Sequence, residues 1–540
     1  MSRTPSTMHR RPFNRTLNVL LAGVLASTAL TTPARAQVRL PALGESASED
    51  LSVGAERRLG EQIMREGRRD PAFLDDPVLN AYLQDLWQPL VRAARERGDI
   101  HAETDQAFAW EAFLVRDRSV NAFALPGGYV GVHLGLIALT SASDQLASVL
   151  AHELTHVTQR HIARSIAPQQ RASMVALATM LLGVLAASRS NSPDMANAAI
   201  VGGQAAAIQG QLNFSRDMER EADRVGYGLL AEAGFSPAGM AGMFEKLDLA
   251  TRLNDNSGFP YLRSHPLTVD RISEARNRAL LGHNAPPLPT LRHAVMQARA
   301  RVMMDDTTQS LQRFSGGSSS PLLADRVGAL YGGALAASLL KDHARAETLA
   351  AEALTAAVTA KPRESAAERD VQLLQAQLRL ARGNAAGALQ VLDALAPAAN
   401  NRPQMLLRAQ AALDLHRATP GSQAAALRRN TEALQTWVAE HPQDAIAWES
   451  LAASADALGL TLRAMRAAAE ARAVVGDLSG ATDRLRAAQA VSRSATGQDF
   501  IEASVIDARL RQIQTLRRQL QLDARGSRDT RTAPVEPLPQ

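Results

Sequence analysis

Two histidines four positions apart form the pattern in this sequence that is most able to do chemistry. The stretch from residue 150 to residue 156 reads LAHELTH. Residues four apart share one face of a helix, so the imidazoles of His152 and His156 can bind the same metal ion. Glu153 lies beside them without being a ligand, where its carboxylate can hold a metal-bound water and accept its proton. Because a match to His-Glu-x-x-His also arises by chance, the motif needs further ligands in support.

A third protein ligand for such a zinc site comes from another helix and is usually a glutamate. The candidate stretch, residues 215–228, reads SRDMEREADRVGYG. Glu219 and Asp223 are one turn apart and share a face, whereas Glu221 points elsewhere. We predict Glu219 as the ligand and Asp223 as the carboxylate that orients a ligating histidine. Glu221 as the ligand is the alternative, and a solvated acidic face would be the reading if this cluster stood alone.

The elements that must position these residues can be read from the apolar pattern. Residues 51–66 and 77–94 have apolar positions at helical spacing, and the pattern is helical again from Asp144 onward. Residues 108–116 and 119–134 are the best strand candidates. A Pro-Gly-Gly turn interrupts the second stretch, which predicts a hairpin or a bulged edge.

A chain of 540 residues is too long for one hydrophobic core, so we expect two or three domains. Apolar residues make up 46% of the chain, which is enough for globular folding, and alanine and leucine are abundant from about residue 320 onward. The fold class we predict is mainly α. An α+β metalloprotease domain with a small edge-strand sheet is followed by an α-helical repeat domain.

The second half of the chain shows a loose repeat. A turn residue stands five positions before an alanine that we expect to be packed, and this spacing resembles degenerate tetratricopeptide repeats, whose ideal period is about 34 residues. A plain helical bundle is the alternative. The pairs are Lys341 with Ala346, Gly383 with Ala388, Gly459 with Ala464, and Gly476 with Ala481.

The N-terminus has the features of a secretory signal. A basic segment precedes an apolar stretch at 17–30, and Ala34-Arg35-Ala36 provides a cleavage site. An uncleaved membrane anchor is the alternative, but the stretch is shorter than the roughly 20 residues that a membrane span needs. The chain has 59 basic and 54 acidic residues, and five of the basic ones but none of the acidic ones lie in residues 1–36. The mature chain would therefore be neutral, which predicts no nucleic-acid partner. Export in a bacterium would place the chain in the periplasm.

Two features refine this picture of an exported chain. There is no cysteine, which excludes a lipid-modified cysteine, disulfides and thiolate zinc ligands. The very apolar segment at 172–187, with residues 196–207, could form a helical hairpin over the site or dip into a membrane surface. A buried core helix is the alternative. The predicted layout is a signal peptide at 1–36, a peptidase domain at 45–285, a connecting helix and linker at 286–321, tetratricopeptide-like repeats at 322–522, and a disordered tail at 523–540.

Four segments, taken in order, resemble peptidase family M48, which includes the prenyl-protein proteases and the membrane heat-shock protease X. The likeness is greatest to its periplasmic branch of beta-barrel assembly-enhancing proteases, which join this domain to tetratricopeptide repeats. The resemblance is strong over residues 45–285. Over residues 320–520 it lies in the domain architecture and not in sequence motifs. The segments are NAFALPGG at 121–128, HELTH at 152–156, EREAD at 219–223, and Ser264-His265-Pro266.

The resemblance implies one zinc ion held by His152, His156 and Glu219. It also implies action on misassembled outer-membrane proteins and contact between the repeat domain and the barrel-assembly machinery. The strand that begins at Asn121 resembles an edge strand that pairs with an extended substrate through backbone hydrogen bonds. Its residues are Asn121, Ala122, Phe123 and Ala124.

Three further residues near these segments have open roles. His265 either fills the fourth position on zinc and keeps the enzyme latent, or is a hydrogen-bonded packing histidine. Arg271 either stabilises an oxyanion or orients a carboxylate of the site. His161 follows His156 by five positions, off the ligand face of a continuous helix, so we expect it to be structural.

The leading hypothesis is therefore an endopeptidase for unfolded or stalled envelope proteins. The competing hypothesis is a chaperone-like scaffold whose protease activity is latent. An inner-membrane protease is a third alternative, but only one short apolar segment follows the predicted signal.

Overall fold

The structure is a computed structural model, and it describes most of the chain beyond residue 50. The predicted signal peptide and the apolar segments at 172–187 and 196–207 lie outside the described residues. The described ranges are 51–165, 215–253, 259–282, 287–314, 317, 319–395, 401–419, 424–492 and 499–532. No helix within these ranges is both long enough and apolar enough to cross a lipid bilayer.

Two capped helices begin the described chain. The side chain of Ser52 accepts a hydrogen bond from the Ala55 amide at the start of α3 (Val53–Gly67). The side chain of Asp76 accepts one from the Leu79 amide at the start of α4 (Pro77–Glu96). Both helices lie where the apolar spacing predicts them. Each begins at a capping oxygen, which satisfies an amide that has no partner in the first turn.

A four-stranded sheet supplies the edge that the sequence predicts. Its strands are β1 (Phe73–Leu74), β2 (Glu111–Val115), β3 (Ala122–Leu125) and β4 (Tyr129–His133). Their order is β1-β2-β4-β3, so β3 lies at one end of the sheet. Strand β2 runs parallel to β4, whereas β1 and β3 are antiparallel to their neighbours.

The tight hairpin between β3 and β4 depends on two glycines. Gly127 and Gly128 have φ angles of 79° and 90°, in the left-handed region that glycine adopts without steric cost. A Cβ atom at Gly128 would also lie 2.8 Å from the Cβ of Phe108. The hairpin predicted from Pro-Gly-Gly is therefore confirmed, and so is the fold class, which is mainly helical with a small sheet.

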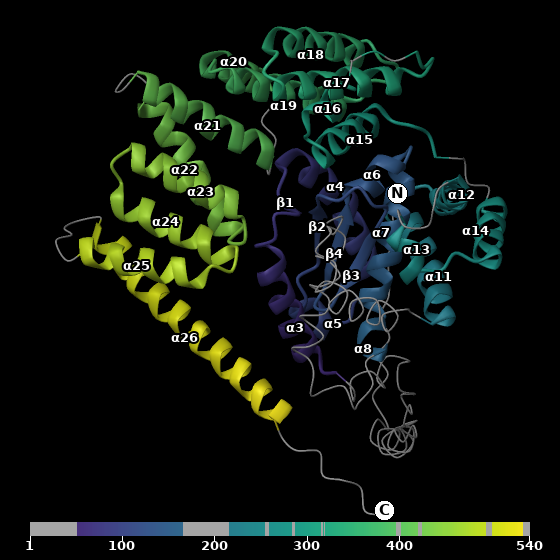
Figure 1. Cartoon of the computed structure of the whole chain (residues 1–540), viewed down its shortest axis with the longest axis horizontal. Coiled ribbons are helices and arrows are strands. Elements are labelled where there is room, and N and C mark those ends of the chain that lie inside the picture. The colour runs from purple at the N-terminus through teal and green to yellow at the C-terminus, as the bar shows by residue number, and fades with distance from the viewer. Residues whose placement is uncertain are drawn as a thin grey trace, which may run out of the picture. The chain divides into compact units, whose positions relative to one another are not determined.

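The helix that carries the His-Glu-x-x-His motif, α7 (Ser143–Thr158), is the buried centre of this region. It packs against β3 and β4 and also against α11 and α12 (Figure 1). Helix α11 approaches closely because Gly226 faces α7. A Cβ atom there would lie 3.3 Å from the backbone of Ala151. The other helices of this region are α5 (Ala102–Ala107), α6 (Leu134–Leu139), α8 (His161–Ser165), α11 (Arg216–Glu232), α12 (Ala238–Leu253), α13 (Pro260–Ser264) and α14 (Val269–Leu281).

The predicted connecting segment at 286–321 contains α15 (Leu291–Met304), and this helix belongs to the core. Val295 and Met296 are fully buried in the cluster that also holds residues of α4 and α7. Arg299 forms a buried ion pair with Asp76, the cap of α4, at 2.7 Å. The segment therefore packs into the core of the first half of the chain and connects it to the helices that follow. The short helix α16 (Thr308–Leu311) follows it.

From α17 to α26 each helix packs against the next one along the chain. Several also contact the helix after that, as α17 does with α19 and α21 with α23. This stacking agrees with helical repeats, although their assignment as tetratricopeptide repeats stays a prediction. The helices are α17 (Leu323–Leu339), α18 (His343–Val358), α19 (Ser365–Ala381), α20 (Ala385–Ala394), α21 (Arg402–Ala418), α22 (Ala424–Glu440), α23 (Ala445–Ala457), α24 (Thr461–Val474), α25 (Leu478–Ser492) and α26 (Asp499–Thr532).

The turn-and-alanine spacing has a simple structural basis. All four turn residues have left-handed backbone, with φ of 67° at Lys341 and 72° to 80° at the three glycines. Each ends one helix, and the alanine five positions later is buried in the next. At the far end, α26 continues to Thr532. The first part of the predicted tail at 523–540 is thus helical, which corrects that prediction.

Candidate metal centre

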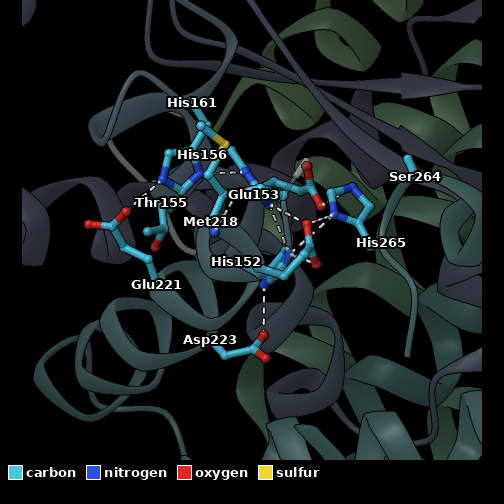
Figure 2. A network of polar contacts seen from close by, with 12 residues as sticks. His152, Glu153, Thr155, His156, His161, Met218, Glu221, Asp223, Ser264 and His265 are labelled. Carbon is cyan, nitrogen blue, oxygen red and sulfur yellow. Dashed lines mark hydrogen bonds and ion pairs between the residues drawn. The ribbon is translucent and has the colours of Figure 1, made fainter. Parts of the chain in front are cut away.

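The imidazoles of His152 and His156 face each other across one turn of α7. Their Nε2 atoms lie 3.0 Å apart. Helix α11 brings the carboxylate of Glu219 to within 3.5 Å of the Nε2 of His152 and 3.4 Å of the Nε2 of His156. His265 follows α13 and places its Nδ1 atom 2.9 Å from Glu219 and 3.3 Å from His152. One donor atom from each of these four buried side chains lies within 4.8 Å of the others. Figure 2 shows the three histidines of this cluster, His152, His156 and His265, close together.

The donors present in this cluster fit a divalent metal ion. Imidazole nitrogens with one carboxylate oxygen are a ligand set that zinc accepts. Glu153 lies beside the cluster and is fully buried, yet neither of its carboxylate oxygens has a hydrogen-bond partner among the described residues. A buried carboxylate without donors is costly, and a bound cation with its water would supply what it lacks.

Asp223, one turn after Glu219 on α11, contacts the far side of His152. Its Oδ1 atom lies 3.0 Å from the Nδ1 of His152. Burial raises the pKa of the Asp223 carboxyl, but the hydrogen bonds from Arg271 and the nearby ring of His152 lower it more, so the group stays ionised. The predicted orienting carboxylate is thus in contact with the predicted ligand.

Electrostatics in the cluster favour a cation. Burial lowers the pKa of His152, but Asp223 and Glu219 outweigh this and raise it to about 10. The same two carboxylates that would hold a proton on His152 would attract a metal ion in its place.

Arg271, on α14, holds the site carboxylates in position. Its Nε and Nη2 atoms donate to the two oxygens of Asp223 at 2.7 Å and 2.8 Å. Its Nη1 atom lies 2.8 Å from Glu219 and donates to the carbonyl of Pro266 at 2.9 Å. Of the two roles left open by the sequence, this geometry favours the orientation of carboxylates.

Sequence reasoning missed a contact between His156 and His161. Their Nδ1 atoms lie 2.8 Å apart, and the Nε2 of His161 lies 3.1 Å from Glu221. Glu221 also accepts a hydrogen bond from Arg164 at 3.1 Å and lies outside the cluster of ligand atoms, which argues against Glu221 as the ligand. Helix α7 ends at Thr158 and Arg160 has a φ of 52°, so His161 returns toward His156. No glycine or proline marks this break in the sequence.

The predicted substrate strand lies at the edge of the sheet, next to α7. The carbonyl of Asn121 accepts from the His133 amide at 3.1 Å. Because hydrogen-bonded pairs alternate in an antiparallel ladder, Phe123 then bonds β4, whereas the backbone groups of Ala122 and Ala124 face away from β4. These outward groups are what an added strand would pair with.

Comparison with known proteins connects these residues to a family. Peptidase family M48 matches residues 77–279. A Vibrio cholerae protein is 40% identical over 283 residues, which cover 50% of this chain and 54% of that protein. The beta-barrel assembly-enhancing protease of Escherichia coli K12 is 37% identical over 240 residues, covering 44% of this chain and 47% of its own.

One relative matches nearly from end to end. The beta-barrel assembly-enhancing protease of Yersinia pestis is 30% identical over 520 residues, which cover 92% of this chain and 98% of that protein. By contrast, the match spans about half the length of the Vibrio cholerae and Escherichia coli relatives.

Proposed function

Because the chain belongs to peptidase family M48, we propose that it is a zinc-dependent endopeptidase. His152, His156 and Glu219 hold the metal ion, and Glu153 acts as the general base. The observation that carries this proposal is the convergence of two elements distant in sequence, α7 and α11, on one buried cluster of donor atoms.

Zinc bound in this cluster would lower the pKa of a bound water and polarise the scissile carbonyl. The carboxylate of Glu153, which accepts no hydrogen bond from the described residues, would take the proton from a water held there. Asp223 fixes the ring of His152 through its Nδ1 atom, and Arg271 fixes Asp223 in turn. The edge strand β3 holds an extended segment of substrate beside α7.

The substrates we propose are misfolded or stalled outer-membrane proteins in the periplasm. The names of the Escherichia coli and Yersinia pestis relatives refer to beta-barrel assembly, which supports this class of substrate. The signal-like residues 1–36 support export to the periplasm. The helices within 322–522 form the repeat domain that recruits substrate or the barrel-assembly machinery. No nucleic acid takes part.

His265 acts in this proposal as a fourth ligand that keeps the enzyme latent. Its Nδ1 atom lies among the ligand atoms, and its Nε2 atom is 3.5 Å from Glu153, where the attacking water would have to sit. Tyr261 packs on its ring at 4.7 Å between centroids, which holds the imidazole in place. Replacing His265 with alanine should raise basal cleavage of casein. Unchanged or lower cleavage by a folded, zinc-loaded variant would reject latency.

The proposal is tested by metal analysis and casein cleavage on the purified mature protein, wild type beside Glu153→Gln. The variant should keep its zinc and its fold but lose cleavage by roughly 100-fold or more, as expected for a general base. Equal cleavage by both proteins would contradict the assignment. If Glu153→Gln still rescues envelope assembly in cells, the chaperone-like scaffold role is the main one.

A further inference from the structure

We propose that His161 and Glu221 are positioning residues that orient the metal ligand His156. The inference rests on the metal site proposed above and extends it outward from His156. His161 lies between the ligand and the carboxylate, in contact with both (Figure 2).

With His161 neutral, the hydrogen-bond chemistry allows one arrangement of protons along this chain of contacts. Glu221 is a carboxylate and only accepts, so the Nε2 atom of His161 carries a proton and donates it. A neutral His161 then has a bare Nδ1 atom, which accepts from the Nδ1–H of His156 at 2.8 Å. The Nε2 atom of His156 is thereby left without a proton, and this is the atom that faces His152 and Glu219. The contacts thus select the tautomer of His156 that can bind a metal ion.

The two ligand imidazoles then have matching support from α11. His152 is held by Asp223 directly, and Asp223 is paired with Arg271. His156 is held by Glu221 through His161, and Glu221 is paired with Arg164 at 3.1 Å. One helix supplies the metal-binding carboxylate and both supporting carboxylates.

Helix geometry explains why the second support needs an intermediate. Successive residues of a helix are turned by about 100°, so Glu221 points about 200° around α11 from Glu219. Its side chain is 24% exposed, whereas that of Glu219 is 3% exposed. Glu221 therefore lies to one side of the cluster, and the ring of His161 bridges the distance to His156.

The backbone around Arg160 is an independent observation that favours the proposal. Its φ of 52° lies in the left-handed region, which is sterically unfavourable for a residue with a side chain. The guanidinium is held by Glu56 at 3.0 Å and by the carbonyl of Leu51. On an unbroken helix His161 would point about 140° away from His156. The turn that brings the two rings together is thus strained and is held in place by buried contacts, as at many functional sites.

The test measures zinc affinity, by competition with a chelator, for the full-length mature protein and its variants. His161→Phe keeps a ring of similar size but removes both nitrogens. We expect it to bind zinc about 10- to 100-fold more weakly, the usual effect of losing a residue that supports a ligand. Glu221→Gln retains an acceptor for His161 and should lose less affinity than Glu221→Ala.

Two further measurements distinguish the positioning of His156 from a role in stability alone. With cobalt in place of zinc, the absorption bands should shift in His161→Phe, because the orientation and basicity of His156 change. The rise in melting temperature on adding zinc should shrink in His161→Phe and Glu221→Ala. As the matched control, His293→Gln alters an equally buried histidine on α15 and should lower stability while leaving zinc affinity unchanged.

The outcomes are distinguishable. If the wild type binds zinc and both His161→Phe and Glu221→Ala bind within twofold of it, this inference is overturned and the metal site stands. If His161→Phe does not fold, the partly exposed Glu221→Ala and Glu221→Gln pair decides the matter by the same measurement. A wild type that takes up no zinc overturns the proposed function and this inference with it.

Discussion

Arg271 grips Asp223 with two parallel hydrogen bonds, from Nε at 2.7 Å and from Nη2 at 2.8 Å. Both side chains are 5% exposed, so the pair lies almost entirely out of water. The third guanidinium nitrogen lies 2.8 Å from Glu219. One cation therefore neutralises two of the carboxylates that surround the predicted metal ion, and it fixes the spacing between them.

Replacing Arg271 with methionine should be strongly destabilising. The change keeps most of the apolar stem but leaves Asp223 and Glu219 buried without their cation. Breaking such a buried pair typically costs about 3–5 kcal/mol. The free energy of unfolding in urea, measured on metal-free protein, should fall by that amount. Arg271→Lys keeps the charge without the bidentate geometry. Its free energy of unfolding should lie between those of the wild type and the methionine variant. A loss below about 1 kcal/mol for methionine, the range of exposed pairs, would contradict this account.

Replacing Ala124 with proline should block substrate pairing without unfolding the sheet. The amide of Ala124 faces away from β4, and proline is tolerated on an edge strand at such a position. The loss of one outward hydrogen bond should lower casein cleavage by roughly 10-fold, with zinc content unchanged. Ala124→Val keeps the amide and is the matched control. Full cleavage by a folded Ala124→Pro protein would show that substrate does not pair with β3.

The native state should lose stability as the pH falls through a window set by His293. Tyr82 donates its hydroxyl hydrogen to the Nδ1 of His293 at 2.6 Å. The Nε2–H of His293 donates to the Thr140 carbonyl at 3.1 Å. Burial lowers the pKa of this histidine to about 4, although the bond to Thr140 opposes the shift. The unfolded chain, with a histidine pKa of about 6.5, binds the proton first as pH falls. The native state should therefore lose up to about 3 kcal/mol between pH 6.5 and 4.

The measurement for this prediction compares urea unfolding of the metal-free wild type and His293→Gln at pH 7 and pH 4.5. Titration of the zinc-site residues is common to both proteins and cancels in the comparison. The wild type should lose more stability than His293→Gln on acidification. Equal losses would show that His293 is not the group responsible.

Much of the site could be predicted because it depends on local spacing. The interval of four between His152 and His156 and between Glu219 and Asp223 fixes which side chains share a helix face. The Pro-Gly-Gly turn likewise specifies the hairpin that puts β3 at the sheet edge, since glycine is the residue that its backbone angles require.

The rest depends on contacts between distant segments or on backbone that the residue type does not reveal. His161 would lie off the ligand face of a continuous helix, and the sequence does not reveal the break at Arg160 because no glycine or proline marks it. Glu56, far away in sequence, helps to hold this turn. The place of Arg271 between two carboxylates required the packing of α14 against α11. The burial of α15 could not be read from its weak amphipathic pattern, because the segment packs on more than one side.

The central claim is that one buried cluster holds a metal ion, and the zinc content of the purified mature protein tests it most directly. The wild type, dialysed against zinc-free buffer, should retain about one zinc ion per chain. His156→Ala and Glu219→Gln should retain almost none, while His293→Gln retains the wild-type amount. A wild type without tightly held metal, or a His156→Ala protein that holds as much as the wild type, would contradict the account.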